Sequence, residues 1–84
     1  MDEAISTIRH TLVLRRVDSE RTVARFYALM IERDLFGRTV LVRYWGRIEG
    51  RGRERSDEHV SESEAAEALA KLASAKRRRG YQEL

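Results

Sequence analysis

The stretch Val40-Leu-Val-Arg-Tyr-Trp-Gly-Arg-Ile48, followed by Glu49-Gly-Arg-Gly-Arg53, predicts a β-strand that runs into a glycine-bearing, arginine-rich turn. The strand is predicted over residues 39–45, because threonine, valine, tyrosine and tryptophan are types that favour strands. A tryptophan ring must either fill a core or offer a flat face to a partner. Several arginines follow this tryptophan. Guanidinium groups bind phosphate through paired hydrogen bonds and aromatic rings stack on bases, so the stretch suits a phosphate-bearing partner.

Alternating apolar and polar residues predict further strands on both sides of this one. In residues 9–17, Leu12 and Leu14 share one parity and Val13 and Val17 the other, which predicts a strand. Residues 22–32 carry β-branched and aromatic side chains, although alanine, leucine and methionine leave a helix possible there. Short polar turns at 18–21 and 33–38 separate these segments, and residues 53–60 form a weakly marked fourth strand. The turns are short and no crossover helix separates the strands, so the sheet is expected to be antiparallel.

A single helix is predicted from Ser61 to about Arg79. Ser61 and Glu64 form a capping box, in which the serine accepts from the amide three residues on and the glutamate reaches back. Apolar residues then recur three and four positions apart, which makes one apolar stripe. Gly80 suits the left-handed position that ends a helix. The expected fold is therefore α+β, an antiparallel sheet of about four strands with one C-terminal helix packed on one face.

Length and composition set the class of protein. With 84 residues, 42 % hydrophobic and 37 % charged, the chain is expected to form one soluble domain over residues 1–84, with a loosely ordered start at residues 1–8. The absence of cysteine excludes disulfides, thiolate metal sites and thiol nucleophiles. The first residues lack the order of a signal peptide, and no apolar run reaches the roughly 18–20 residues of a membrane span. We therefore expect a cytoplasmic protein with no membrane partner.

Positive charge is concentrated in two segments, although the net charge is only +3. Residues 36–55 contain six arginines against two acidic residues, and residues 71–79 contain five basic residues and no acid. A charged segment is most often a solvated surface, and the second segment also complements the dipole at the end of the predicted helix. A binding role for either segment therefore needs a further argument.

The order of several short motifs supplies that argument, because it resembles the WGR domain family. The Trp-Gly-Arg triplet that names the family occurs here as Trp45-Gly46-Arg47 at a strand end, followed by a glycine-containing turn and a capped helix. Phe26-Tyr27, Lys76 and Gly80-Tyr81 also match, so that the resemblance covers roughly residues 11–81. Two adjacent positions depart from the family, which commonly has Gly-Thr where this chain has Glu49-Gly50.

The resemblance implies a sheet with one helix and a nucleic-acid-binding role. In the DNA-dependent poly(ADP-ribose) polymerases, the domain contacts DNA near a break and helps to relay that contact to a separate catalytic domain. Short stand-alone bacterial members, which this chain resembles in length, have a less settled function. Glu49 would place a negative charge in the contact turn, where it either pairs with Arg47 or Arg51 or repels a phosphate.

The candidate nucleic-acid contacts lie in the two basic segments. They are Arg43, Trp45, Gly46, Arg47, Arg51, Arg53, Lys76, Arg77 and Arg78. The arginines are expected to bind phosphate, whereas in a purely structural role Arg47 would pair with Glu49 or Glu54. Trp45 would stack on a base or sugar, or would instead seal the sheet against the helix. Gly46 is needed for backbone geometry or close approach.

No sequence pattern for catalysis or metal binding is present. His10 and His59 lack ligand-spaced partners and are expected to be ordinary residues, and Tyr81 is expected to pack back on the sheet. The acidic pairs lie in polar stretches where nothing raises a pKa for acid–base work. The chain is therefore predicted to have no enzymatic activity, cofactor, metal or small-molecule substrate.

Two functions follow from these observations. The first is a small non-enzymatic module that binds nucleic acid with little sequence specificity, with duplex DNA or DNA ends favoured over RNA. It would use the arginine-rich turn and Trp45. The alternative is a protein-interaction or relay module that docks an acidic partner through the same tryptophan–arginine surface, because tryptophan and arginine dominate the energetics of protein interfaces.

Overall fold

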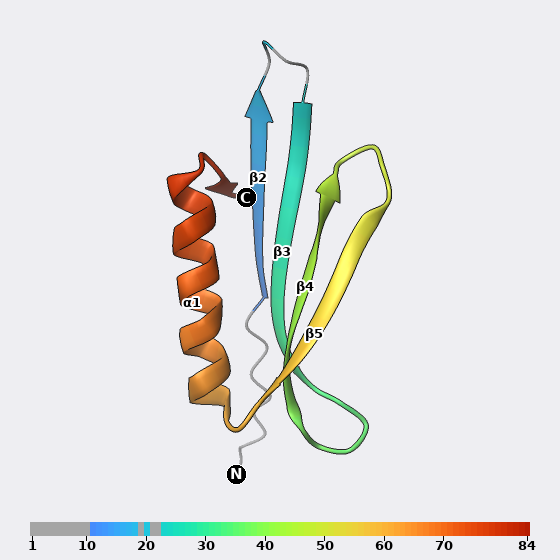
Figure 1. Cartoon of the computed structure of the whole chain (residues 1–84), viewed down its shortest axis with the longest axis vertical. Helices are drawn as coiled ribbons and strands as arrows, with labels where there is room; N and C mark the ends of the chain where they lie inside the picture. The colour runs from blue at the N-terminus through green and yellow to red at the C-terminus, as the bar shows by residue number, and fades with distance from the viewer. Residues whose placement is uncertain (1–10, 19, 21–22) are drawn as a thin grey trace.

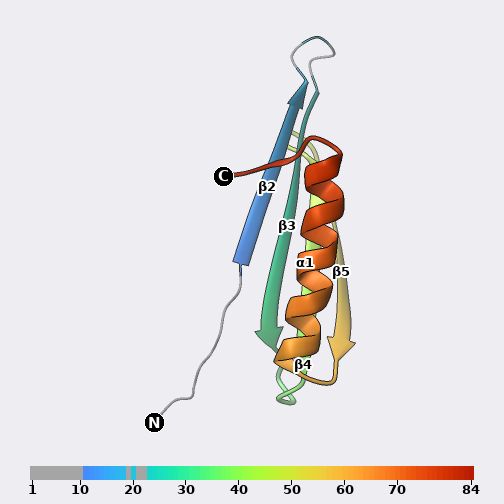
Figure 2. The ribbon, with the colours of Figure 1, turned by 90° about the vertical axis from the view of Figure 1, so that its left-hand side faces the viewer.

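Figures 1 and 2 show the computed structural model, which describes residues 11–18, 20 and 23–84. The described residues form a five-stranded antiparallel sheet with one helix packed along one of its faces. The elements follow the chain as β2 (Thr11–Asp18), β3 (Val23–Arg33), β4 (Thr39–Arg47), β5 (Gly52–His59), α1 (Glu62–Arg78) and β6 (Gln82–Glu83). The predicted α+β class with a C-terminal helix is confirmed. The expected loose start at residues 1–8 and His10 lie outside the described residues.

The strand order is β5-β4-β3-β2-β6, so strands β2 to β5 follow one another as a meander of hairpins. The segment for which a helix remained possible is strand β3, which pairs with β2 on one side and β4 on the other. Strand β6 was not predicted from the sequence. It pairs with β2, where Leu14 lies opposite Glu83 and Arg15 lies opposite Gln82. Two residues are too few to show an alternating pattern, so no local signal in the sequence predicts this strand. The strand follows α1 directly, so its position depends on where the helix ends.

The pairing register sorts the side chains onto two faces. Leu14, Tyr27 and Trp45 lie directly opposite one another on β2, β3 and β4, on the face covered by α1. The helix contacts β3, β4 and β5. Residues one position along, such as Ala28 and Tyr44, point to the opposite face, because side chains alternate along a strand.

The core lies between α1 and the covered face of the sheet. Its buried apolar and aromatic residues are Leu14, Tyr27, Leu29, Ile31, Leu41, Ala65, Ala73 and Tyr81. The buried positions of the helix are both alanines, which lets its backbone lie close to the sheet. Tyr81 is 8 % exposed, so it packs back on the sheet after the helix ends, as predicted.

The helix begins and ends at the predicted residues, with one difference in the cap. The Ser61 hydroxyl oxygen accepts a hydrogen bond from the Glu64 amide at 3.1 Å. The Glu64 carboxylate reaches back to the Val60 amide at 3.1 Å, one residue before the position expected in a capping box. Gly80 ends the helix with φ of 96°, a left-handed conformation that favours glycine. Figure 1 shows that the C-terminal end of α1 lies at the same end of the sheet as the β4–β5 turn.

Candidate nucleic-acid interface

A row of three arginines crosses the sheet near the C-terminal end of α1. Arg16 of β2 lies directly opposite Arg25 of β3, which lies directly opposite Arg47 of β4. The row shares the helix-bearing face with the core, because Leu14 and Tyr27 lie two positions along the same strands. All three arginines are exposed, and no carboxylate of the described residues lies within 4.0 Å of their guanidinium groups. The positive charge of the row is therefore uncompensated, and the guanidinium groups repel one another because like charges lie directly opposite in the sheet.

An aromatic pair lies beside this row. The rings of Trp45 and Tyr27 stack with their centroids 5.9 Å apart and their planes at 23°. Trp45 is half-buried and packs against the core, which agrees with the structural interpretation of this residue. The residue stays partly exposed, and Arg53 of β5 lies directly opposite it in register. Trp45 is therefore anchored and also accessible.

Lys76 of α1 lies on the same surface as the arginine row and the aromatic pair. Its Nζ lies 4.4 Å from the centroid of the Tyr27 ring and 5.5 Å from that of Tyr81, so aromatic faces support the ammonium group. Burial lowers the pKa of Lys76, and the nearby positive charges of Arg79 and Arg25 lower it further. Lys76 therefore lies among positive charges from β3 and from the end of α1.

These residues together form what we call the basic face. Its members are Arg16, Arg25, Arg47, Arg53, Lys76 and Arg79. They come from β2, β3, β4, β5 and the end of α1, so the surface depends on the pairing of the strands and on the docking of the helix.

Arg43 lies next to the basic face but is engaged by a carboxylate. Its Nη2 donates to Asp57 Oδ2 at 3.0 Å, and its side chain is only 19 % exposed. Burial opposes the charge, but the contacts with Tyr27 and Asp57 outweigh it and raise the pKa of Arg43. Asp57 also accepts from Arg55 Nε at 3.2 Å. The buried Nε of Arg43 has no hydrogen-bond partner among the described residues.

The glycine of the triplet allows two chain segments to approach closely. A Cβ at Gly46 would lie 2.9 Å from the Arg51 carbonyl oxygen and 3.1 Å from Gly52 Cα. The turn that follows is closed by the Gly50 amide, which donates to the Arg47 carbonyl at 3.0 Å. Close approach therefore accounts for Gly46, and it is one of the two reasons expected from the sequence.

The remaining predicted contacts lie at the edges of this surface. Arg51 is exposed in the β4–β5 turn. Arg77 is exposed but pairs with Glu83 of β6 at 3.1 Å, and Arg78 is exposed at the last helical position. Within the described residues Glu49 forms no ion pair, so neither of its two predicted partners holds it.

Sequence reasoning missed three members of the basic face, Arg16, Arg25 and Arg79. The alternation in β3 does place Arg25 on the same side as Tyr27, and this signal was available. What the alternation could not indicate is that Arg25 lies between two further arginines. That arrangement depends on the registers of two hairpins.

The fold and this surface define a small α+β module with one strongly basic end. The sequence model of the WGR domain family matches residues 10–84, and the chain belongs to this family. The WGR domain is generally a nucleic-acid-binding module in proteins related to the poly(ADP-ribose) polymerases, and alone it is a non-catalytic module.

A relative in the bacterium Sinorhizobium fredii (strain NBRC 101917 / NGR234) is the uncharacterized protein y4dW. The two sequences are 39 % identical over 72 residues, which cover 86 % of this chain and 35 % of y4dW. The chain therefore spans about a third of the length of this relative. No solved structure matches the chain.

The described part of the chain offers neither a metal site nor a membrane-spanning helix. No group of three histidine, cysteine or acidic side chains there is placed to hold a metal ion. The helix of that part is too short and too polar to cross a membrane.

Proposed function

We propose that this domain binds nucleic acid through the basic face, with duplex DNA and DNA ends as its preferred forms. The observation that carries the proposal is the row of Arg16, Arg25 and Arg47 on three adjacent strands. Repulsion within such a row opposes folding, and a polyanion would reverse it by inserting phosphates between the guanidinium groups. Neighbouring strands lie about 4.8 Å apart, so the backbone positions of the row span about 10 Å.

Lys76 extends the positive surface from the sheet to the helix. Its ammonium group is held over the rings of Tyr27 and Tyr81, so less side-chain entropy is lost when a phosphate binds there. Arg79 adds a guanidinium group beside it. The phosphate backbone would therefore run across the strands from Arg47 towards the end of α1.

Trp45 would provide the preference for ends. Trp45 is partly exposed and Arg53 lies directly opposite it, so a terminal base pair would pack against the ring while its phosphates contact the arginines. Contacts of this kind are worth about 1–3 kcal/mol per stacked base. The basic face offers mainly phosphate contacts, which fix position and do not discriminate sequence, so little sequence specificity is expected.

The test compares forms of nucleic acid by fluorescence anisotropy. Labelled open-ended duplex DNA, closed dumbbell duplex DNA, single-stranded DNA and single-stranded RNA would be titrated with wild type and with Trp45→Ala. We expect the open-ended duplex to bind most tightly and to lose its advantage over the dumbbell in the variant. Weak and equal binding of all four forms, unchanged in the variant, would contradict the proposal. Such a result would favour the alternative, an acidic protein partner at the same surface.

A further inference from the structure

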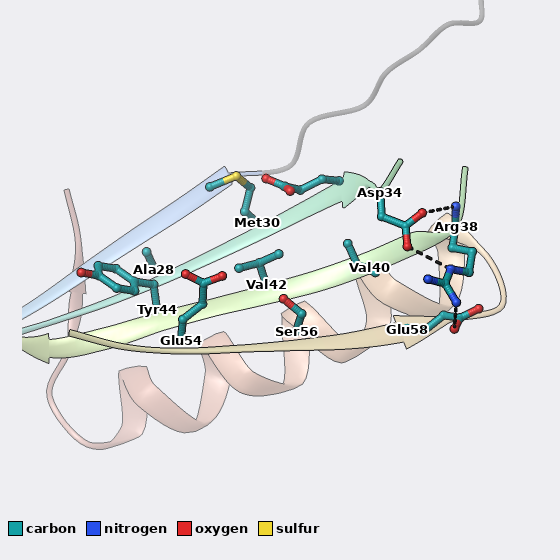
Figure 3. A pocket seen from close by; sticks show the side chains of 11 residues that line it. Ala28, Met30, Asp34, Arg38, Val40, Val42, Tyr44, Glu54, Ser56 and Glu58 are labelled. Atoms are coloured by element: carbon teal, nitrogen blue, oxygen red, sulfur yellow. Dashed lines mark hydrogen bonds and ion pairs between the residues drawn. The ribbon is translucent and has the colours of Figure 1, made fainter. Parts of the chain in front are cut away.

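The face of the sheet turned away from α1 carries a second surface that the basic face does not use. Its centre is an apolar strip of half-buried and exposed side chains (Figure 3). The strip consists of Ala28, Met30, Val40, Val42 and Tyr44. They lie in a shallow trough of about 770 Å³ along β3 and β4. None of the elements described in the structure covers this trough, as Figure 2 shows for the single helix.

The chemistry along the strip changes from one end to the other. At one end the rings of Phe26 and Tyr44 lie 5.3 Å apart, and Tyr44 is 42 % exposed. At the other end Val40 lies opposite Glu32 and Glu58 on the two neighbouring strands. Ala28, a small residue, lies directly opposite Tyr44 and leaves room for a partner to approach the sheet.

The rim of the trough is acidic, in a protein whose net charge is positive. Its carboxylates are Glu32, Asp34, Glu54 and Glu58, and its single cation is Arg38. Arg38 is already neutralised, because it contacts Asp34 at 2.9 Å and Glu58 at 3.6 Å. Glu32 and Glu54 have no ion-pair partner among the described residues. Beyond the trough, Arg15 of β2 lies on this face opposite Phe26.

From this surface we infer that the trough docks an amphipathic helix of a partner protein whose apolar stripe is flanked by lysine or arginine. The apolar strip supplies an apolar contact, and the carboxylates of the rim, which outnumber its one cation, select positive charge beside that contact. The same carboxylates repel nucleic acid and anionic lipid. They also disfavour a second copy, because two trough faces brought together would oppose acidic rims.

The dimensions of the strip suit a short helix. From the level of Phe26 to that of Glu32 the strand advances six residues, which is about 20 Å. A helix of about 13 residues has this length, or between three and four turns. Docked there, it would form a second helical layer opposite α1, and the domain would carry nucleic acid and a basic partner on opposite faces. This inference goes beyond the proposed function and does not depend on it.

The test uses the full chain and two labelled 14-residue peptides that share one stripe of leucines. The flanking positions carry lysine in the first peptide and glutamate in the second. By fluorescence anisotropy, the lysine peptide is expected to bind at least tenfold more tightly than the glutamate peptide. Two variants test the location: Val42→Arg in the strip, and the double variant Glu32→Lys/Glu54→Lys on the rim. The control is Glu67→Lys, which makes one of these charge changes at an exposed position of α1.

Val42→Arg should abolish binding of the lysine peptide, and the double variant should weaken it about three- to tenfold, with Glu67→Lys unchanged. Circular dichroism establishes whether Val42→Arg folds, and the double variant carries the test alone if it does not. Equal binding of the two peptides, no binding of either, or binding that the double variant leaves unchanged would overturn the inference. A dimer in sedimentation equilibrium that the double variant alters would overturn it in favour of a second copy.

Discussion

Gly46 shows how one missing side chain shapes the surface around the tryptophan. A Cβ at this position would meet the Arg51 carbonyl oxygen at 2.9 Å, and backbone atoms cannot move aside as a flexible side chain can. We therefore expect Gly46→Ala to destabilise the domain by about 1–3 kcal/mol, the usual cost of inserting an atom into a packed site. The measurement is the midpoint of urea denaturation at unchanged slope.

The neighbouring turn offers a matched control. A Cβ at Gly50 would lie 3.6 Å from the Arg47 Cβ, which is an ordinary contact, so Gly50→Ala should change stability by less than about 0.5 kcal/mol. If both alanine variants had equal stability, close approach at Gly46 would not explain the glycine.

The arginine row makes a second prediction at the scale of single residues. Arg25 lies at the centre of the row, opposite both Arg16 and Arg47. Arg25→Ala should weaken binding of duplex DNA about three- to tenfold, and should make the slope of log K against log salt less negative by about 0.9, the value for one phosphate. Anisotropy titrations at several salt concentrations measure both quantities.

The control for Arg25 lies on its own strand. Arg33 has the same side-chain direction along β3 and is exposed, but it lies eight residues away, or about 27 Å, opposite Thr39. Arg33→Ala removes the same charge and should leave affinity and slope almost unchanged. A loss as large as that of Arg25→Ala would mean that net charge, and not the row, sets the binding.

At the scale of single residues, the sequence points to candidates near the triplet, but it does not predict which side chains lie beside them on the folded surface. The order of motifs identifies Trp45 and Arg47, because both belong to the Trp-Gly-Arg triplet. It does not predict that Arg43, on the same face, is held by Asp57 at 3.0 Å. Fourteen residues separate these two partners, and only the β4–β5 register brings them together.

At the scale of the elements, Glu64 connects strand β5 to the start of α1. Its carboxylate accepts from the Val60 amide and contacts His59 Nδ1 at 3.0 Å. The hydrogen bond from Val60 lowers the pKa of Glu64 below its ordinary value of 4.5, and the contact with His59 lowers it further. A carboxylate with a lowered pKa in the folded state stabilises the fold above its ordinary pKa. This contribution is lost as the pH falls from about 4.5 through the folded value.

We therefore expect part of the acid sensitivity of this domain to come from Glu64. Between pH 6 and pH 3 the urea midpoint should fall in wild type, and should fall less in Glu64→Gln, which has no charge to lose. Asp34 and Asp57 also have lowered pKa values, so some decrease remains in the variant. Glu67→Gln, at an exposed position of the same helix, serves as the control. If Glu64→Gln and Glu67→Gln lost stability equally, the cap would not be the acid-sensitive group.

The elements were predictable to the extent that they repeat a local pattern. The helix from Glu62 to Arg78 follows from its cap, its apolar spacing and Gly80, and the four longer strands follow from alternation. The bounds differ by a few residues, because strand ends depend on the pairing partner. Strand β6 and the reach of Glu64 to Val60 depend on how α1 docks, which no local pattern contains.

At the scale of the whole molecule, the two faces of the sheet carry opposite charge. The basic face gathers arginines from four strands and the end of α1, whereas the acidic rim of the trough lies on the other side. The net charge of +3 is therefore a difference between two separated surfaces. A protein of this kind responds to salt in more than one way, because screening weakens repulsion within each face and attraction to each partner.

This separation predicts that salt affects stability and DNA binding in opposite directions. Between 20 mM and 300 mM NaCl the screening length falls from roughly 20 Å to about 6 Å, so repulsion within the arginine row weakens and the urea midpoint should rise. The rise should be smaller in Arg25→Ala than in Arg33→Ala, because only the first variant removes a charge from the row. Over the same range, contacts with about three to five phosphates should make log K for DNA fall with a slope of roughly −3 to −4.5. Equal rises in both variants would place the repulsion outside the row, and an affinity independent of salt would exclude phosphate contacts as the basis of binding.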